Sequence, residues 1–121
     1  MNKDALGNLA QFTGTENYYQ HLNIQYTDGI KFLAENADCY WLLDAIASYQ
    51  PELRKDSRLN YFQLWELKLA NQGGGGGAIL ACTDGDSADP LVSQQIQHTD
   101  FPLPSVRLYV EQGVLLLPTE H

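Results

Sequence analysis

The sequence lacks a long hydrophobic run, an excess of basic charge and a dense set of cysteines. No apolar stretch approaches the roughly 18 residues of a membrane-spanning helix, and residues 1–12 hold no segment typical of a signal peptide. Two cysteines, Cys39 and Cys82, are too few for a disulfide framework, so we expect two buried free thiols. These absences predict a cytoplasmic protein that does not enter the membrane.

Basic residues are scarce, with 7 Lys and Arg against 15 Asp and Glu, which gives a formal net charge of −8. None lies between Lys68 and Arg107, although this stretch carries Asp84, Asp86, Asp89 and Asp100. Such a charge repels nucleic-acid phosphates and anionic lipid headgroups. We therefore expect no direct nucleic-acid binding and no membrane association, and we expect a negative surface over this stretch.

The chain of 121 residues has the size of one domain, which we assign to residues 1–121. A domain of this size buries roughly two thirds of the surface that its unfolded chain exposes. Hydrophobic residues make up 44% of the sequence, enough for one compact core. The seven tyrosines offer large contact areas for a core or an interface.

Residues 1–50 have the pattern of a helical part. The apolar spacing predicts a short helix over Asp4–Phe12, a second over Asp28–Asn36 and a third over Tyr40–Gln50. Asp38 is the expected N-cap of the third helix, and Pro51 is expected to end it. The segment between the first two helices, with its adjacent tyrosines, fits a helix, a turn or a strand.

A polar connector over residues 51–60 leads to strands in residues 61–121. Alternation of apolar and polar side chains predicts strands over Tyr61–Ala70, Ala78–Thr83 and Val92–His98. A final hairpin turns at Gln112–Gly113, and a flexible glycine loop at residues 73–77 joins the first two strands.

These elements predict an α+β domain. We expect two or three N-terminal helices packed on one face of a mainly antiparallel sheet of about five strands, all from the C-terminal half. The other face of the sheet is then available to a second subunit.

Three stretches carry a resemblance: TGTENYYQH at residues 13–21, YTDGIKFLAENADCYWLLDAIASYQ at 26–50, and TDFPLPSVRLYVEQGVLLLPTEH at 99–121. Together they resemble a family of small bacterial single-domain proteins catalogued only as a domain of unknown function. The most specific pieces are YTDG, YWLLDAIASYQ and GVLLLP. The resemblance implies a shared fold and transfers no catalytic residue.

Asp44 is the one charged residue in the Tyr40–Gln50 helix, which is hydrophobic on nearly every side. Such a helix belongs in the protein interior, where a carboxylate must be paired, hydrogen-bonded or neutral. We therefore expect Asp44 to be buried. It then either fixes the packing through hydrogen bonds or forms the floor of a pocket in which burial raises its pKa. The candidate binding residues of that pocket are Asp44, Tyr40, Trp41, Tyr18, Tyr19 and His21.

No catalytic motif is assembled in the sequence. Cys39, His98 and Asp100 contain the residue types of a cysteine nucleophile with its base, but no spacing brings them together. The histidines lack the spacing of a metal site, so we assign no catalytic residue, metal or cofactor. The sequence favours a non-enzymatic interaction module that binds a protein partner or a second copy of itself. The alternative is a small ligand-binding protein or enzyme with a pocket around Asp44.

Overall fold

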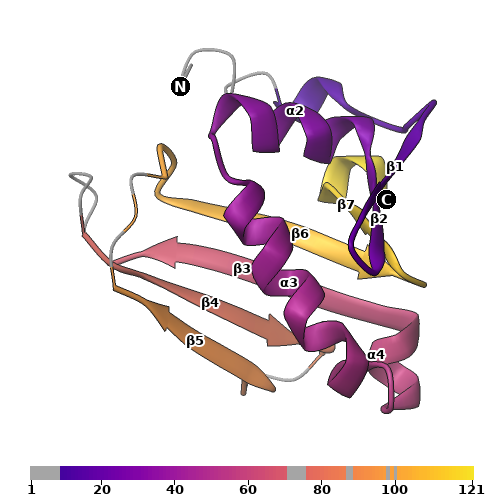
Figure 1. The fold of residues 1–121 in the computed structure, drawn as a ribbon, viewed down its shortest axis with the longest axis vertical. Helices are drawn as coiled ribbons and strands as arrows, with labels where there is room; N and C mark the ends of the chain where they lie inside the picture. The colour runs from indigo at the N-terminus through magenta and orange to yellow at the C-terminus, as the bar shows by residue number, and fades with distance from the viewer. Residues whose placement is uncertain (1–8, 71–75, 87–88, 98, 100) are drawn as a thin grey trace.

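Seven strands form a single sheet in the computed structural model, which describes residues 9–70, 76–86, 89–97, 99 and 101–121 (Figure 1). The strands are β1 (Tyr18–His21), β2 (Ile24–Thr27), β3 (Phe62–Leu69), β4 (Ala78–Thr83), β5 (Val92–Ile96), β6 (Ser105–Glu111) and β7 (Val114–Leu116). Their order across the sheet is β1-β2-β7-β6-β3-β4-β5. All neighbours are antiparallel except β2 and β7, which are parallel.

The predicted sheet of about five strands from the C-terminal half was wrong, because β1 and β2 come from the N-terminal half. These strands form a hairpin in which Tyr19 pairs with Tyr26, and its turn is Leu22–Asn23. Leu22 has a φ of 52°, a left-handed conformation that two-residue hairpin turns usually assign to Gly, Asn or Asp. The turn therefore carries no strong sequence signal, and the hairpin was missed.

The C-terminal strands follow the predicted alternation. Along β3 the buried side chains are Gln63, Trp65 and Leu67, and the residues between them are more exposed. β6 lies beside β3 with Leu108 opposite Trp65, and the predicted Gln112–Gly113 turn leads into β7. His98, Asp100 and Gly73–Gly75, which the sequence analysis singled out, lie outside the described residues.

Three α-helices lie between β2 and β3 in the chain: α2 (Asp28–Asn36), α3 (Tyr40–Leu53) and α4 (Ser57–Tyr61). Two short 3-10 turns, η1 (Leu9–Gln11) and η2 (Pro118–Glu120), lie near the chain ends. The α2 range is the predicted one, whereas the first predicted helix is described only from Leu9 onward, where it forms η1. No helix in the described residues is long and apolar enough to cross a membrane.

Pro51 lies inside α3 and does not end it, so the predicted boundary was wrong. A proline in a helix cannot donate to the carbonyl four residues earlier, which here belongs to Ala47. The side-chain amide of Asn23, at the β1–β2 turn, donates to that carbonyl at 3.1 Å. This bond satisfies the carbonyl that Pro51 leaves without its helical donor, and α3 continues to Leu53. Asp38 is not the N-cap either, because it has a left-handed φ of 52° and the cap position is Cys39.

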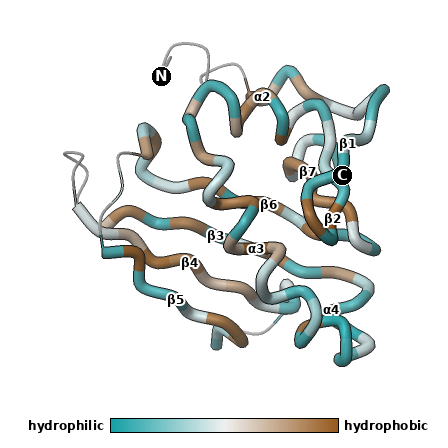
Figure 2. The backbone as a smooth tube through the Cα atoms, viewed as in Figure 1, coloured by the Kyte–Doolittle hydropathy of each residue, from teal (hydrophilic) through white to brown (hydrophobic). Residues whose placement is uncertain are grey.

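The core lies between the helices and one face of the sheet. α3 runs across β6 and β3, while α2 lies over β2 and β7 (Figure 1). Hydrophobic residues dominate β4, while α4 is largely hydrophilic (Figure 2). The fully buried side chains come from both layers: Ile30, Leu33, Leu43 and Ile46 from the helices, and Trp65, Leu80, Leu108 and Leu115 from the sheet.

Glu120 joins the two ends of the domain. Its carboxylate accepts hydrogen bonds from the Thr27 hydroxyl at 2.7 Å and from the backbone N–H of Gly29 at 3.1 Å. Thr27 is also the N-cap of α2 and accepts from the N–H of Ile30. A Cβ on Gly29 would lie 2.5 Å from the Glu120 carboxylate, so a larger residue would displace Glu120 from this position. This contact gives the YTDG segment a structural role.

Candidate functional site

Asp44 is exposed, so the prediction that it is buried was wrong. Its side chain is 62% accessible, because the buried side of α3 is formed by other residues of the helix: Leu42, Leu43, Ile46, Ala47, Gln50 and Leu53. One sheet covers one side of a helix and leaves the other side in water. The aromatic residues that made the helix look hydrophobic all round are only half-buried: Tyr40, Trp41 and Tyr49.

The structure brings three of the predicted site residues together. His21, at the end of β1, places its Nε2 2.6 Å from the Asp44 carboxylate. The His21 ring also lies near the ring of Tyr40, with centroids 6.1 Å apart, and near the ring of Tyr26 at 6.4 Å. Burial raises the pKa of Tyr40 to about 12, so its hydroxyl stays protonated at neutral pH. These residues form a polar and aromatic cluster beside the β1 edge.

Tyr19 lies next to this cluster and is held by Asp28. Its hydroxyl donates to the Asp28 carboxylate at 2.9 Å, and this bond raises the pKa of Tyr19. The Asp28 carboxylate also accepts the backbone N–H of Glu16, which is the main cause of its lowered pKa. The Lys31 ammonium lies 5.0 Å from the centre of the Tyr19 ring. These bonds fix the segment before β1 against α2.

No hydrogen bond or ring contact in the described residues joins Trp41 or Tyr18 to the His21–Asp44 pair. Trp41 is half-buried and packs against the hydrophobic core. Tyr18 projects to the opposite face of the sheet, because side chains alternate along β1 and Tyr19 lies on the helix side. The six predicted residues therefore do not line one pocket.

No α-helix in the described part of the chain packs on the opposite face of the sheet, which we call the open face. Alternation with the buried Trp65 and Leu108 assigns the open-face side chains. They include Phe62, Leu64, Glu66 and Lys68 on β3, Ile79 and Ala81 on β4, Arg107, Tyr109 and Glu111 on β6, Val114 and Leu116 on β7, and Tyr18 on β1.

Three rings form a cluster on the open face, which we call the aromatic centre. Tyr109 lies 5.0 Å from Phe62 and 5.5 Å from His121, measured between ring centroids, and Phe62 and His121 are 6.3 Å apart. His121 also contacts the Glu111 carboxylate through its Nδ1. The sequence analysis did not select these residues, although the alternation in β3 and β6 places Phe62 and Tyr109 on the face away from the helices.

Charges on the open face balance. Glu66 accepts from Arg107 at 3.1 Å and lies 3.6 Å from Lys68, so one acid is paired with two bases, and Glu111 is the second acid. The face is therefore close to neutral, in a chain whose net charge is −8.

Three recesses are lined by described residues, and two of them include a ring of the aromatic centre. The Arg58 recess, of about 680 Å³, is lined by Ser57, Arg58, Tyr61, Phe62, Asp84, Gly85 and Asp86. The His121 recess, of about 400 Å³, is lined by Thr15, Tyr18, Thr27, Glu111, Gln112, Val114, Leu116, Glu120 and His121. The Arg54 recess, of about 360 Å³, is lined by Gln20, Asn23, Gln25, Arg54, Asn60, Gln112 and Gly113. Gln112 lines two of them, and Phe62 links the Arg58 recess to the His121 ring.

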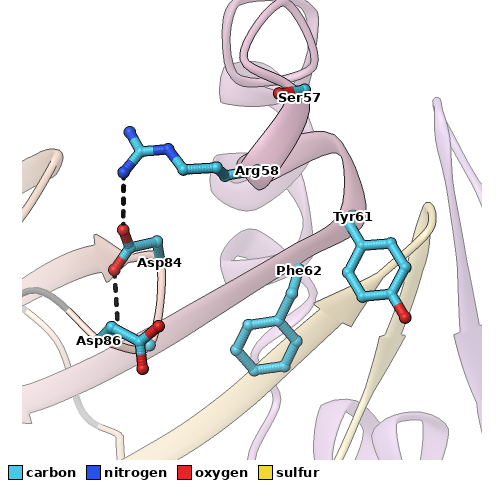
Figure 3. Close-up of a pocket in the computed structure, with 7 residues that line it drawn as sticks. Ser57, Arg58, Tyr61, Phe62, Asp84 and Asp86 are labelled. Atoms are coloured by element: carbon cyan, nitrogen blue, oxygen red, sulfur yellow. Dashed lines mark hydrogen bonds and ion pairs between the residues drawn. The ribbon is translucent and has the colours of Figure 1, made fainter.

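The Arg58 recess holds a fixed ion pair. Arg58 donates to Asp84 at 2.9 Å (Figure 3). It also donates to Asp56 at 3.0 Å, and Asp56 followed by Asp84 raises the pKa of Arg58. Figure 3 shows Phe62 between this acidic side and the ring of Tyr61, whose residue is 67% exposed. The recess therefore joins a charged wall to an aromatic one.

The described residues give little support for a nucleophilic cysteine or a metal site. Cys39 and Cys82 are buried, and burial raises the pKa of each thiol to about 12, which leaves almost no thiolate at neutral pH. No group of three or more His, Cys, Asp or Glu residues that could hold a metal ion occurs within the described residues. His98 and Asp100 are outside them.

A family model described as a family of unknown function (DUF6876) matches residues 3–121. The chain belongs to this family. Comparisons of this DUF6876 member with curated proteins and with solved structures gave no match. The expected membership in a family of unknown function is confirmed, and the match covers both the YTDG segment and the C-terminal hairpin.

Proposed function

We propose that this DUF6876 protein is a protein interaction module whose contact surface is the open face. The aromatic centre of Phe62, Tyr109 and His121 carries the proposal, because aromatic residues are enriched in the cores of protein interfaces. The recesses around it offer pockets for side chains of a partner.

The charge distribution supports a protein partner. A chain of net charge −8 repels other acidic surfaces, including those of its own copies, over most of its area. The near-neutral open face avoids this repulsion, and its ion pairs at Glu66 are already formed within the chain. We expect binding through this face to depend weakly on salt. The two free cysteines fit a reducing compartment, which is consistent with a cytoplasmic module.

Site-specific photo-crosslinking in the native host tests this function. A benzoylphenylalanine in place of Leu64 lies on the open face opposite Tyr109, and the same group in place of Glu35 on α2 is the matched control. We expect one defined adduct from position 64 and none from position 35. An adduct of twice the 13.5 kDa chain mass identifies a second copy, and any other mass identifies a different protein. Equal adducts from both positions, or none from position 64, would contradict the proposal.

A second candidate function is binding of a small polar ligand beside the His21–Asp44 pair. The 2.6 Å contact between these residues favours it, because histidine and carboxylate together can exchange a proton with a ligand. Ligand screening by histidine-detected NMR tests it. We expect bound ligands to shift the His21 ring signals in the natural chain and to cause no such shift in Asp44→Asn. Ligands that shift these signals equally in that variant would count against this second function.

A further inference from the structure

The Arg54 recess lies where four distant segments meet. The β1–β2 hairpin contributes Gln20, Asn23 and Gln25, the end of α3 contributes Arg54, α4 contributes Asn60, and the β6–β7 turn contributes Gln112 and Gly113. Its lining contains five side-chain amides and one guanidinium, and no carboxylate. This composition is unusual in a chain with 15 acidic residues.

Arg54 has unused hydrogen-bonding capacity. Of the three arginines, Arg58 and Arg107 pair with carboxylates, whereas Arg54 pairs with none among the described residues. Within the described residues its guanidinium makes one hydrogen bond, from Nη2 to the carbonyl oxygen of Asn23 at 2.7 Å. A guanidinium carries five N–H donors in a planar fork that fits a carboxylate. The remaining donors are available to an anionic ligand.

The amides extend this capacity. The side chains of Gln25, Asn60 and Gln112 make no hydrogen bond within the described residues, and each offers both a donor and an acceptor. Gln20 and Asn23 use their amide nitrogens on backbone carbonyls, which leaves their side-chain oxygens as acceptors. A ligand with a hydroxyl or amide next to its anionic group would use both kinds of site.

We propose that the Arg54 recess binds a carboxylate that carries a neighbouring amide or hydroxyl group. One guanidinium balances one negative charge, and the nearest basic residue in the chain, Lys55, is paired with Glu52. A phosphate dianion would bring a second charge into a strongly acidic chain, so carboxylate is favoured over phosphate. The volume of about 360 Å³ lies at the small end of the range for ligand sites, roughly 300–1,000 Å³.

This chemistry has two sources, a free small organic acid and the C-terminal carboxylate of a peptide. Titration of the full chain, followed by NMR of the Asn and Gln side-chain amides and the Arg54 guanidinium, distinguishes them. The probes are acetate, N-acetylglycine, triglycine with a free carboxylate, and the amidated forms of the last two. Binding of N-acetylglycine with stronger binding of triglycine indicates a peptide terminus, and equal binding of the two indicates a small acid.

We expect the carboxylate probes to shift the recess signals with an affinity on the order of 1 mM, and the amidated probes to bind at least tenfold more weakly. Arg54→Gln should weaken binding at least tenfold. Lys55→Gln, with the same loss of charge at the adjacent, largely exposed position, should change it less than twofold. Because Arg54 also holds the Asn23 carbonyl, Asn60→Ala is a second variant on an exposed amide, and it should weaken binding at least threefold.

Three results would overturn the proposal. They are the absence of recess shifts at tens of millimolar probe, equal binding of the free and amidated probes, and binding that survives unchanged in both Arg54→Gln and Asn60→Ala.

Discussion

Gln50 on α3 and Gln63 on β3 exchange two amide hydrogen bonds inside the core, each with 2.9 Å between Nε2 and the partner's Oε1. Both residues are almost completely buried. Gln63 also accepts from the indole N–H of Trp65 at 2.8 Å and donates to the carbonyl of Leu59 at 2.9 Å. Every polar atom of the pair has a partner, so the network ties α3, α4 and β3 in one arrangement.

The two glutamines should respond unequally to substitution. Gln63→Leu leaves the Trp65 N–H, one donor of Gln50 and one acceptor of Gln50 without hydrogen-bond partners in the core. It should lower the free energy of unfolding by about 3 kcal/mol or more. Gln50→Leu leaves mainly one donor of Gln63 without a partner, because the Gln63 oxygen still accepts from the Trp65 N–H. It should lower the free energy of unfolding by about 1–2 kcal/mol. Urea denaturation of both variants checks this order.

The double variant Gln50→Leu, Gln63→Leu is the control, because it removes both partners together. Its cost should be smaller than the sum of the two single costs. Strict additivity would mean that the two amides do not act as a pair.

Asp44→Leu should cost less than about 1 kcal/mol, because an ion pair with a largely exposed carboxylate contributes little to stability. Ser48→Leu, on the same exposed stripe of α3, controls for the effect of an added surface leucine. Thermal unfolding of both variants checks this. A loss of several kcal/mol for Asp44→Leu alone would show that Asp44 is part of the packed structure.

Alkaline pH should destabilise the protein through its two thiols. The pKa of Cys39 and of Cys82 is about 12 in the folded chain against 9.0 for a free thiol. Above pH 9 the unfolded chain therefore loses protons that the folded chain keeps, so the free energy of unfolding falls as pH rises towards 12. Each thiol contributes at most about 1.4 kcal/mol per pH unit in this window.

Urea titrations between pH 8 and pH 11 measure this slope. Cys82→Ala should reduce it by the share of one thiol, whatever the variant's stability at neutral pH. An unchanged slope would mean that Cys82 ionises as easily in the folded chain as in the unfolded one.

Leu22→Asn should stabilise the β1–β2 hairpin by about 0.5–1 kcal/mol, because asparagine tolerates the left-handed conformation better than leucine. Leu22 is 68% exposed, so its side chain gives up little packing. Leu22→Val, which adds a branched Cβ at the same φ, should destabilise the protein. Melting temperatures of the two variants should therefore move in opposite directions.

The sequence could predict α2 and the strands β3, β4, β6 and β7, because capping residues and strict alternation are local signals. It could not predict that β2 pairs in parallel with β7, since that contact joins Tyr26 to Leu115 and has no local signature. The β1–β2 hairpin was missed because its turn uses Leu22 where glycine is usual.

The candidate site was predicted only in part. The sequence analysis selected Asp44 as a buried carboxylate, whereas the structure places it on the exposed side of α3 with His21 beside it. Asp44 was predicted to be buried because the tyrosines and the tryptophan of this helix were taken as wholly buried. These side chains pack against the core with one edge and expose the other edge to solvent. Hydropathy alone could not predict the buried glutamine pair, because a polar residue such as Gln63 in an alternating strand is expected on the exposed face.

The hydrogen bond from Asn23 to the Ala47 carbonyl couples the residue at position 23 to the residue at position 51. With alanine at position 51 the helix supplies its own donor to that carbonyl, and the hairpin amide is no longer required. Asn23→Ala should therefore be harmful in the natural chain and nearly neutral beside Pro51→Ala. Among DUF6876 relatives, asparagine at the turn and proline in the helix should be inherited together or lost together.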